Sequence, residues 1–123
     1  NFNINNIEIS GDKKINNIIY KNLKGLKNND VSEKNFDLQI ISSIKKDVTS
    51  NDTDGNPKTY SLSISIKLKI KQGSKVYSEK EFLERTTYNK QTTKFELKKY
   101  EGKITETLGE KISDEIIFFL SRI

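Results

Sequence analysis

A strict alternation of apolar and polar residues between Tyr60 and Lys71 is the clearest pattern along the chain. Every second residue from Tyr60 to Ile70 is apolar, and the residues between them are serines and lysines. Side chains alternate between the two faces of a strand. The segment therefore predicts a long strand with one covered face and one solvated face.

Three other segments have strand character, and two stretches of turn residues separate the later ones. The predicted strands are Phe2 to Ile9, Phe36 to Thr49 and Val76 to Asn89. The alternation in the first of these is imperfect, which indicates a bulge or an edge position. The stretch from Ser50 to Pro57 contains Asp-Gly and Asn-Pro, so we expect it to form a hairpin tip. Gln72-Gly73-Ser74 predicts a second, shorter turn.

Helical spacing of the apolar residues replaces the alternation in two segments. Apolar residues three and four apart predict an amphipathic helix from Asp12 to Lys27, which Ser10 or Asp12 can cap. The same spacing predicts a long helix from Phe95 to the end of the chain. Gly102 and Gly109 each weaken that helix by roughly 1 kcal/mol relative to alanine, so its packing must offset the loss.

The order of elements is therefore β-α-β-β-β-α, in a single domain that spans residues 1–123. This order predicts an α+β fold: a two-layer sandwich in which two helices pack on one face of a four-stranded mixed sheet. The first β-α-β unit allows a right-handed parallel crossover. The last three strands are expected to form an antiparallel meander.

The composition argues against an enzyme. The chain has no cysteine and no histidine, which excludes Ser-His and Cys-His catalysis and zinc sites built on these residues. We expect no catalytic residues, no cofactor and no metal. Asp52 and Asp54 loosely suggest a calcium loop, but they lack a glutamate at the twelfth position, so a plain turn is favoured. Glu79, Glu81 and Glu84 are interpreted as one solvated, charge-paired face.

The net charge of +5 comes almost entirely from lysine, since Arg85 and Arg122 are the only arginines. The chain is rich in Lys, Asn and Ile, which have AT-rich codons, and has no Ala, whose codons are GC-rich. An AT-rich genome is therefore one explanation of the basic charge. A basic partner-binding face is the other. Its candidates are the row Lys67, Lys69 and Lys71, about 7 Å apart along one strand face, and the pair Lys98 and Lys99 at the start of the last helix. Cations at the start of a helix are slightly unfavourable for the helix, so the placement of Lys98 and Lys99 suggests an anionic partner. The strand row has a second explanation, because lysines also keep an exposed sheet face soluble.

Several ordered motifs carry a family resemblance. An Asp-Gly turn precedes Tyr60-Ser-Leu-Ser-Ile-Ser-Ile. The next strand contains Phe82-Leu-Glu-Arg-Thr-Thr-Tyr88, in which Arg85 precedes an aromatic residue by three positions. The last helix has Tyr100 and closes on Ile116-Ile-Phe-Phe-Leu120. Over nearly the whole chain, this set resembles the LptE-like family of lipopolysaccharide-assembly lipoproteins.

The resemblance implies a non-enzymatic scaffold at the periplasmic face of the outer membrane. Such a subunit fills the lumen of an LptD-like β-barrel translocon and contacts lipopolysaccharide. The family's lipid anchor is carried by an N-terminal cysteine that this sequence does not contain. If the chain binds lipopolysaccharide, we expect a partly electrostatic contact with its anionic phosphates, and the candidates are Lys67, Lys69, Lys71, Lys98 and Lys99. We expect the hairpin tip to contact the barrel partner through Asp52, Thr53, Asp54, Gly55, Asn56 and Lys58.

Two alternative functions stay open. From Asp12 onward the order α-β-β-β-α is that of double-stranded RNA-binding domains, and Lys98-Lys99 could imitate their lysine cluster. The long strands, the extra first strand and the many acidic residues argue against nucleic-acid binding. An unrelated periplasmic interaction module of the same architecture is the second alternative.

Overall fold

The computed structural model describes residues 3–26 and 35–123 and has the predicted order of elements. Strand β1 (Asn3–Gly11) leads into helix α1 (Lys13–Leu23) and a short 3-10 helix, η1 (Lys24–Leu26). Three long strands follow, β2 (Asn35–Asn51), β3 (Pro57–Gln72) and β4 (Lys75–Asn89). The chain closes with helix α2 (Lys94–Leu120).

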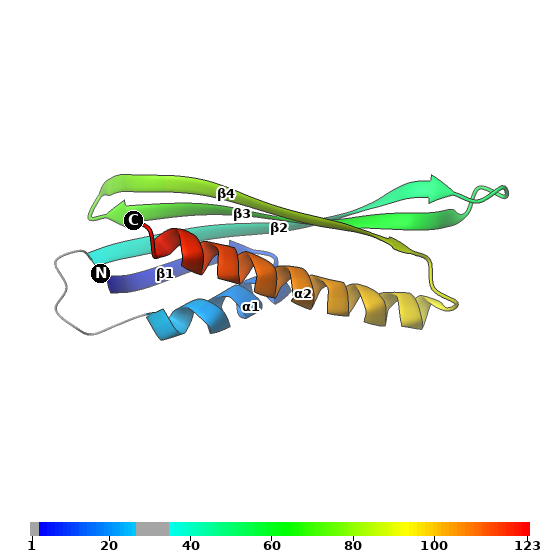
Figure 1. Ribbon diagram of the computed structural model, residues 1–123, viewed down its shortest axis with the longest axis horizontal. Helices are drawn as coiled ribbons and strands as arrows, with labels where there is room; N and C mark the ends of the chain where they lie inside the picture. Colours follow the sequence, from blue (N-terminus) through cyan, green and yellow to red (C-terminus); the bar gives the residue numbers. More distant parts are fainter. Residues whose placement is uncertain (1–2, 27–34) are drawn as a thin grey trace.

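The four strands form one mixed sheet in the order β1-β2-β3-β4. β1 runs parallel to β2, whereas the β2–β3 and β3–β4 pairs are antiparallel. Both helices lie on the same side of the sheet (Figure 1). α1 contacts β1 and β2, α2 contacts β3 and β4, and the two helices contact each other. The predicted two-layer sandwich is confirmed.

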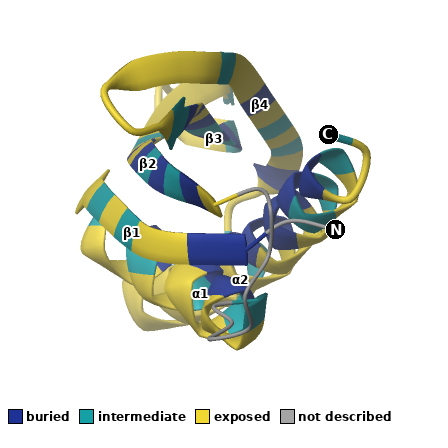
Figure 2. Cartoon of the chain, turned by 90° about the vertical axis from the view of Figure 1, so that its left-hand side faces the viewer, coloured by how far each residue is buried: buried dark blue, intermediate teal, exposed yellow. Residues whose placement is uncertain are grey.

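The buried apolar residues of the described chain form one core between the sheet and the two helices (Figure 2). On β3, all the residues of one alternation from Leu62 to Ile70 are buried, as the sequence pattern predicts. The helices contribute residues at helical spacing to the same core: Ile15, Ile19 and Leu23 from α1, and Leu108, Ile112, Ile116 and Leu120 from α2. The apolar stripes of helices and strands thus cover each other.

A tight corner joins β1 to α1. Gly11 has a φ of 103°, and a Cβ atom at this position would lie 1.9 Å from the carbonyl oxygen of Ser42, so only glycine fits. Asp12 then caps α1 by accepting a hydrogen bond of 3.0 Å from the backbone N–H of Ile15. The irregularity expected in the first strand is a register shift between Ile4 and Asn6.

Two local predictions were wrong. The first helix leaves α-helical geometry at Leu23 and continues as η1, which contains Gly25, a poor helix former. The predicted end at Lys27 lies outside the described residues. Ser61, expected on the solvated face, is fully buried. It lies in register between Asp47 and Thr87 on the neighbouring strands, and these larger side chains flank it.

The far end of the β2–β3 hairpin leaves the helix layer. Figure 1 shows this end of the two strands rising away from α2. Every residue of β2 from Lys45 to Thr49 is exposed, including those of the alternation that faces the core elsewhere. In the described parts of the chain, neither helix has the length and hydropathy needed to span a membrane.

Candidate functional site

The hairpin tip is a compact turn organised by Asp52. Its Oδ1 accepts hydrogen bonds of 2.9 Å from the backbone N–H groups of Asp54 and Asn56. The hydrogen bond from Asn56 is the main cause that holds the pKa of Asp52 below its usual value. Gly55 completes the turn with a φ of 84°. Within the described residues no group of three or more acidic side chains has the arrangement of a metal site.

The tip presents mostly polar side chains to solvent. Thr53, Asp54, Asn56 and Lys58 are exposed, whereas Asp52 is half-buried by the turn that it organises. The carbonyl of Lys58 accepts a hydrogen bond of 3.0 Å from the N–H of Lys90, which ties the tip to the connection after β4. All the predicted partner-contact residues except Asp52 are therefore exposed around the turn.

A polar network fixes the base of the hairpin to α2. The Nζ of Lys46 on β2 lies 2.8 Å from the carboxylate of Glu101 on α2 and 4.6 Å from the ring centre of Tyr60 on β3. The hydroxyl of Tyr88 on β4 donates to the same carboxylate. Burial, followed by this hydrogen bond, raises the pKa of Tyr88, which therefore stays protonated and able to donate. Side chains of β2 and β4 thus meet at one carboxylate of α2, and β3 joins the network through the contact of Tyr60 with Lys46.

Beside this network lies a half-exposed apolar ridge that sequence reasoning missed. Val48 is in register with Tyr60, whose ring stacks on Tyr88 at 5.6 Å. Tyr88 in turn contacts Tyr100 at 5.9 Å. Val48 is 49% exposed and Tyr100 is 42% exposed. The available sequence signal was Val48, an apolar residue of the core-facing alternation near the end of β2.

The row Lys67, Lys69 and Lys71 lies on the outer face of the sheet, as predicted. Lys67 and Lys69 are exposed, and Lys71 is half-buried. A carboxylate lies directly across from each lysine on a neighbouring strand: Glu81 opposite Lys67, Glu79 opposite Lys69 and Asp37 opposite Lys71. The Lys69–Glu79 pair is 3.8 Å apart. The row is therefore compensated in charge rather than a bare strip of cations.

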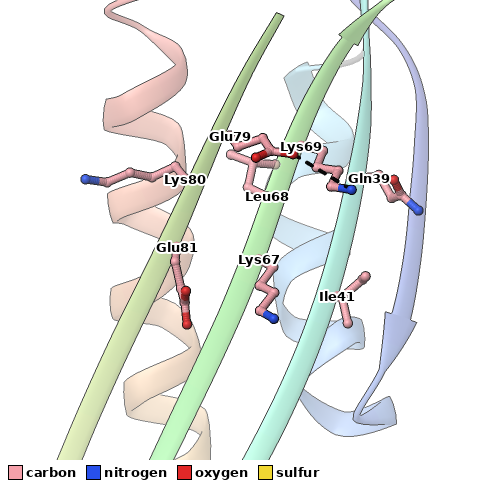
Figure 3. A pocket seen from close by; sticks show the side chains of 8 residues that line it. All are labelled: Gln39, Ile41, Lys67, Leu68, Lys69, Glu79, Lys80 and Glu81. Carbon is pink, nitrogen blue, oxygen red and sulfur yellow. Dashed lines mark ion pairs between the residues drawn. The ribbon is translucent and has the colours of Figure 1, made fainter. Parts of the chain in front are cut away.

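A shallow hollow of about 580 Å³ opens on this outer face. Figure 3 shows Lys67 and Lys69 beside Glu79 and Glu81, with Ile41 next to them on β2. Ile41 is 42% exposed and provides an apolar patch. The hollow can accept an amphipathic group that carries both an anionic and an apolar part.

Lys98 and Lys99 are exposed near the start of α2, where Thr93 caps the helix by accepting from the N–H of Glu96 at 3.1 Å. Lys14 on α1 also reaches this end, since its Nζ donates to the carbonyl of Gly102 at 3.2 Å. Gly102 follows Lys98 by one helical turn, so Lys14 adds a cation to the same side.

The structure does not assemble the five candidate lysines into one site. Lys71 lies opposite Val76, near the start of β4, whereas α2 begins beyond the other end of that strand. The twelve residue steps from Val76 to Tyr88 span roughly 40 Å of strand. The lysine row also lies on the outer face of the sheet, and α2 lies on the opposite face. They are two separate basic regions.

The interpretation of the three glutamates as one solvated face was wrong for Glu84. Glu79 and Glu81 lie on the outer face, but Glu84 has the opposite parity and points to the helix layer. Its carboxylate lies 3.0 Å from the Nζ of Lys111 and is hydrogen-bonded to Glu115. Burial and then the hydrogen bond to Glu84 raise the pKa of Glu115 to about 7. This carboxyl pair lies in a groove of about 800 Å³ between β4 and α2.

No protein-family model matches the chain. No curated protein matches it either. Solved structures do share its fold. Rare lipoprotein B from Shewanella oneidensis aligns with a TM-score of 0.74 at 16% identity, over 96% of this chain and 95% of that one.

Other solved lipoproteins show the same likeness. Uncharacterized lipoprotein B from Nitrosomonas europaea aligns with a TM-score of 0.66 at 10% identity, over 94% of this chain and 81% of that one. A lipoprotein from Caulobacter crescentus aligns with a TM-score of 0.59 at 11% identity, over 94% and 88% of the two chains. The chain therefore has the fold of these bacterial lipoproteins along almost its whole length.

Proposed function

We propose that the protein is a non-enzymatic envelope lipoprotein that plugs an LptD-like β-barrel translocon and contacts lipopolysaccharide during its insertion into the outer leaflet. The observation that carries this proposal is the full-length match of the fold to rare lipoprotein B. A lipid anchor at the periplasmic face of the outer membrane belongs to the same proposal.

The shape of the hairpin supports a contact with a barrel. The tip is polar, and the network of Lys46, Tyr88 and Glu101 fixes the hairpin base to α2. A fixed hairpin can enter a water-filled lumen without losing much conformational entropy on binding. The ridge of Val48, Tyr60 and Tyr100 offers apolar area beside the polar tip. The polar tip suits the lumen of a barrel, whose interior is polar, and the ridge adds apolar contact area beside it.

The hollow on the outer face supports a contact with lipopolysaccharide. The amines of Lys67 and Lys69 can face phosphates, and Ile41 can face an acyl chain. Glu79 and Glu81 oppose the same phosphates, so we expect modest affinity that weakens with salt. Lysine makes point-charge contacts rather than the bidentate contacts of arginine, which also limits affinity.

Binding of lipopolysaccharide to charge variants tests this part of the proposal. Replacing Lys67, Lys69 and Lys71 together with glutamate should abolish binding, and Glu79→Gln with Glu81→Gln should strengthen it. Lys45→Glu is the matched control, because Lys45 is exposed on the same face outside the hollow. Circular dichroism spectra should stay unchanged in every variant, since all these side chains lie on the outer face of the sheet, away from the core.

The same titration separates the nucleic-acid alternative. Double-stranded RNA should not compete with lipopolysaccharide for the wild-type chain. Unchanged lipopolysaccharide binding in the triple lysine variant, together with tight binding of double-stranded RNA by the wild type, would overturn the translocon proposal in favour of RNA binding.

A further inference from the structure

The sheet has two outer strands, and β4 offers the longer and more regular free edge. β1 has nine residues and carries the bulge between Ile4 and Asn6, and both features hinder pairing with another strand. β4 has fifteen residues and pairs with β3 without a register break from Ser78 to Asn89. In the part of the chain that the structure describes, no strand lies beyond β4. Its outer edge is therefore available for main-chain pairing.

Exposed apolar side chains gather next to this edge. Leu83 on β4 is 65% exposed, and Phe118 on α2 is 61% exposed. Phe118, Phe82 and Phe119 bound the groove of about 800 Å³ between β4 and α2. An open strand edge beside exposed aromatic surface is typical of a protein contact.

The charges of β4 are complementary to those of a second, antiparallel β4. When Phe82 lies opposite the Phe82 of the other copy, Lys80 lies opposite Glu84 and Glu79 lies opposite Arg85. Two-fold symmetry repeats each pairing, so four ion pairs form. Lys80 and Glu84 share the face toward the helices, whereas Glu79 and Arg85 share the outer face. Opposite charges in such cross-strand positions stabilise pairing.

Other registers are less favourable. A two-fold axis perpendicular to the sheet leaves the helix-facing side chains of both copies on the same side. Residues directly opposite each other must then have the same parity, so one residue lies opposite its own copy at the centre. Centring on Glu81 or on Glu84 places two glutamates against each other. Centring on Leu83 pairs Glu81 with Arg85 but leaves Lys80 and Glu79 opposite threonines. The register through Phe82 pairs the most charges.

We propose that the free edge of β4 pairs antiparallel with β4 of a second copy, centred on Phe82, and joins the two sheets into one. The carboxyl pair in the groove supports this arrangement. Glu84 and Glu115 share one cation of their own chain, Lys111, and the partner copy would bring Lys80 as a second. The inference does not depend on the proposed contact with a barrel or with lipopolysaccharide.

A charge-swap series measured by sedimentation velocity over a concentration range tests the pairing. The wild type should show a monomer–dimer equilibrium. Glu79→Arg and Arg85→Glu should each weaken the dimer roughly ten-fold or more, because like charges then face each other twice. The double swap should restore the dimer. Lys45→Glu, which reverses an exposed charge on β2, is the matched control and should leave the dimer unchanged.

Spin labels on introduced cysteines test the register, because the natural chain has no cysteine. Labels at Leu83→Cys should lie close together in the dimer. Labels at Ser43→Cys, in the same cross-strand row two strands away, should lie about 20 Å farther apart. A wild type that stays monomeric at its highest soluble concentration would overturn the proposal. A dimer whose stability does not change with the charge swaps would also overturn it. So would a β4 edge that pairs with a different protein and not with a second copy of this chain.

Discussion

Ile18 on α1 packs so closely on Gly109 of α2 that a methyl group at Gly109 would lie 3.1 Å from two carbon atoms of Ile18. The two helices cross at this point, and the absence of a side chain at Gly109 permits the approach. The sequence showed Gly109 only as a weak point in a long helix. The contact with α1 explains why the chain carries a glycine there.

This contact predicts different outcomes at the two glycines of α2. Gly109→Val should destabilise the fold by about 1–3 kcal/mol through overpacking. Gly102→Ala should stabilise it by up to about 1 kcal/mol, because only the flexible end of Lys14 lies near that position. Urea unfolding measures both. Ile18→Ala should recover part of the loss in Gly109→Val, and equal effects at the two glycines would argue against the close crossing.

The alternation in β3 predicts a second contrast. Ile66 is fully buried, so Ile66→Lys should cost several kcal/mol by placing an unpaired charge in the core. Ser65 faces outward within 3.4 Å of the carboxylate of Glu81. Ser65→Lys should therefore change stability by less than about 0.5 kcal/mol. Similar shifts in the denaturant midpoints of the two variants would be incompatible with the strand orientation.

The fold could be predicted from the sequence because apolar residues recur with one period in strands and with another in helices. The alternation from Tyr60 to Ile70 and the helical spacing around Ile112 both point to one core, and Asp12 marks a helix start. The sequence did not predict which side chains of different elements contact each other. Glu84 was grouped with Glu79 although its parity differs, and nothing local to the chain places Lys111 or Glu115 beside it.

The candidate site was predictable only in part, for the same physical reason. Local chemistry located the turn around Gly55 and the outward lysine row. It could not show that a carboxylate faces each lysine, since register decides that pairing. Nor could it show that Lys98 and Lys67 lie on different faces of the molecule.

The carboxyl pair predicts a pH dependence of stability. The pKa of Glu115 rises from 4.5 to about 7 on folding, so the folded state binds more protons between those values. This group therefore stabilises the fold at low pH, and its contribution is lost as pH rises towards about 7. Glu84, whose pKa is lowered, acts in the opposite direction and stabilises the fold above its unfolded pKa.

The variant Glu115→Gln isolates that effect. Relative to the wild type, it should become progressively more stable as pH rises from about 5 to about 8. Urea unfolding at a concentration below any self-association measures the difference, and carbon NMR titration of the Glu115 carboxyl checks its pKa directly. A stability difference that stays constant with pH would show that Glu115 titrates normally.

Photo-crosslinking from the hairpin tip in the organism that makes the protein tests most directly whether the chain plugs a barrel. A photoreactive residue in place of exposed Thr53 should trap an outer-membrane β-barrel protein, and the trapped complex should contain one copy of each chain. The same residue in place of exposed Lys24, on η1, controls for general proximity and should trap that barrel less efficiently. If Thr53 traps no barrel protein, and the chain purifies from outer membranes without one, the translocon proposal is wrong.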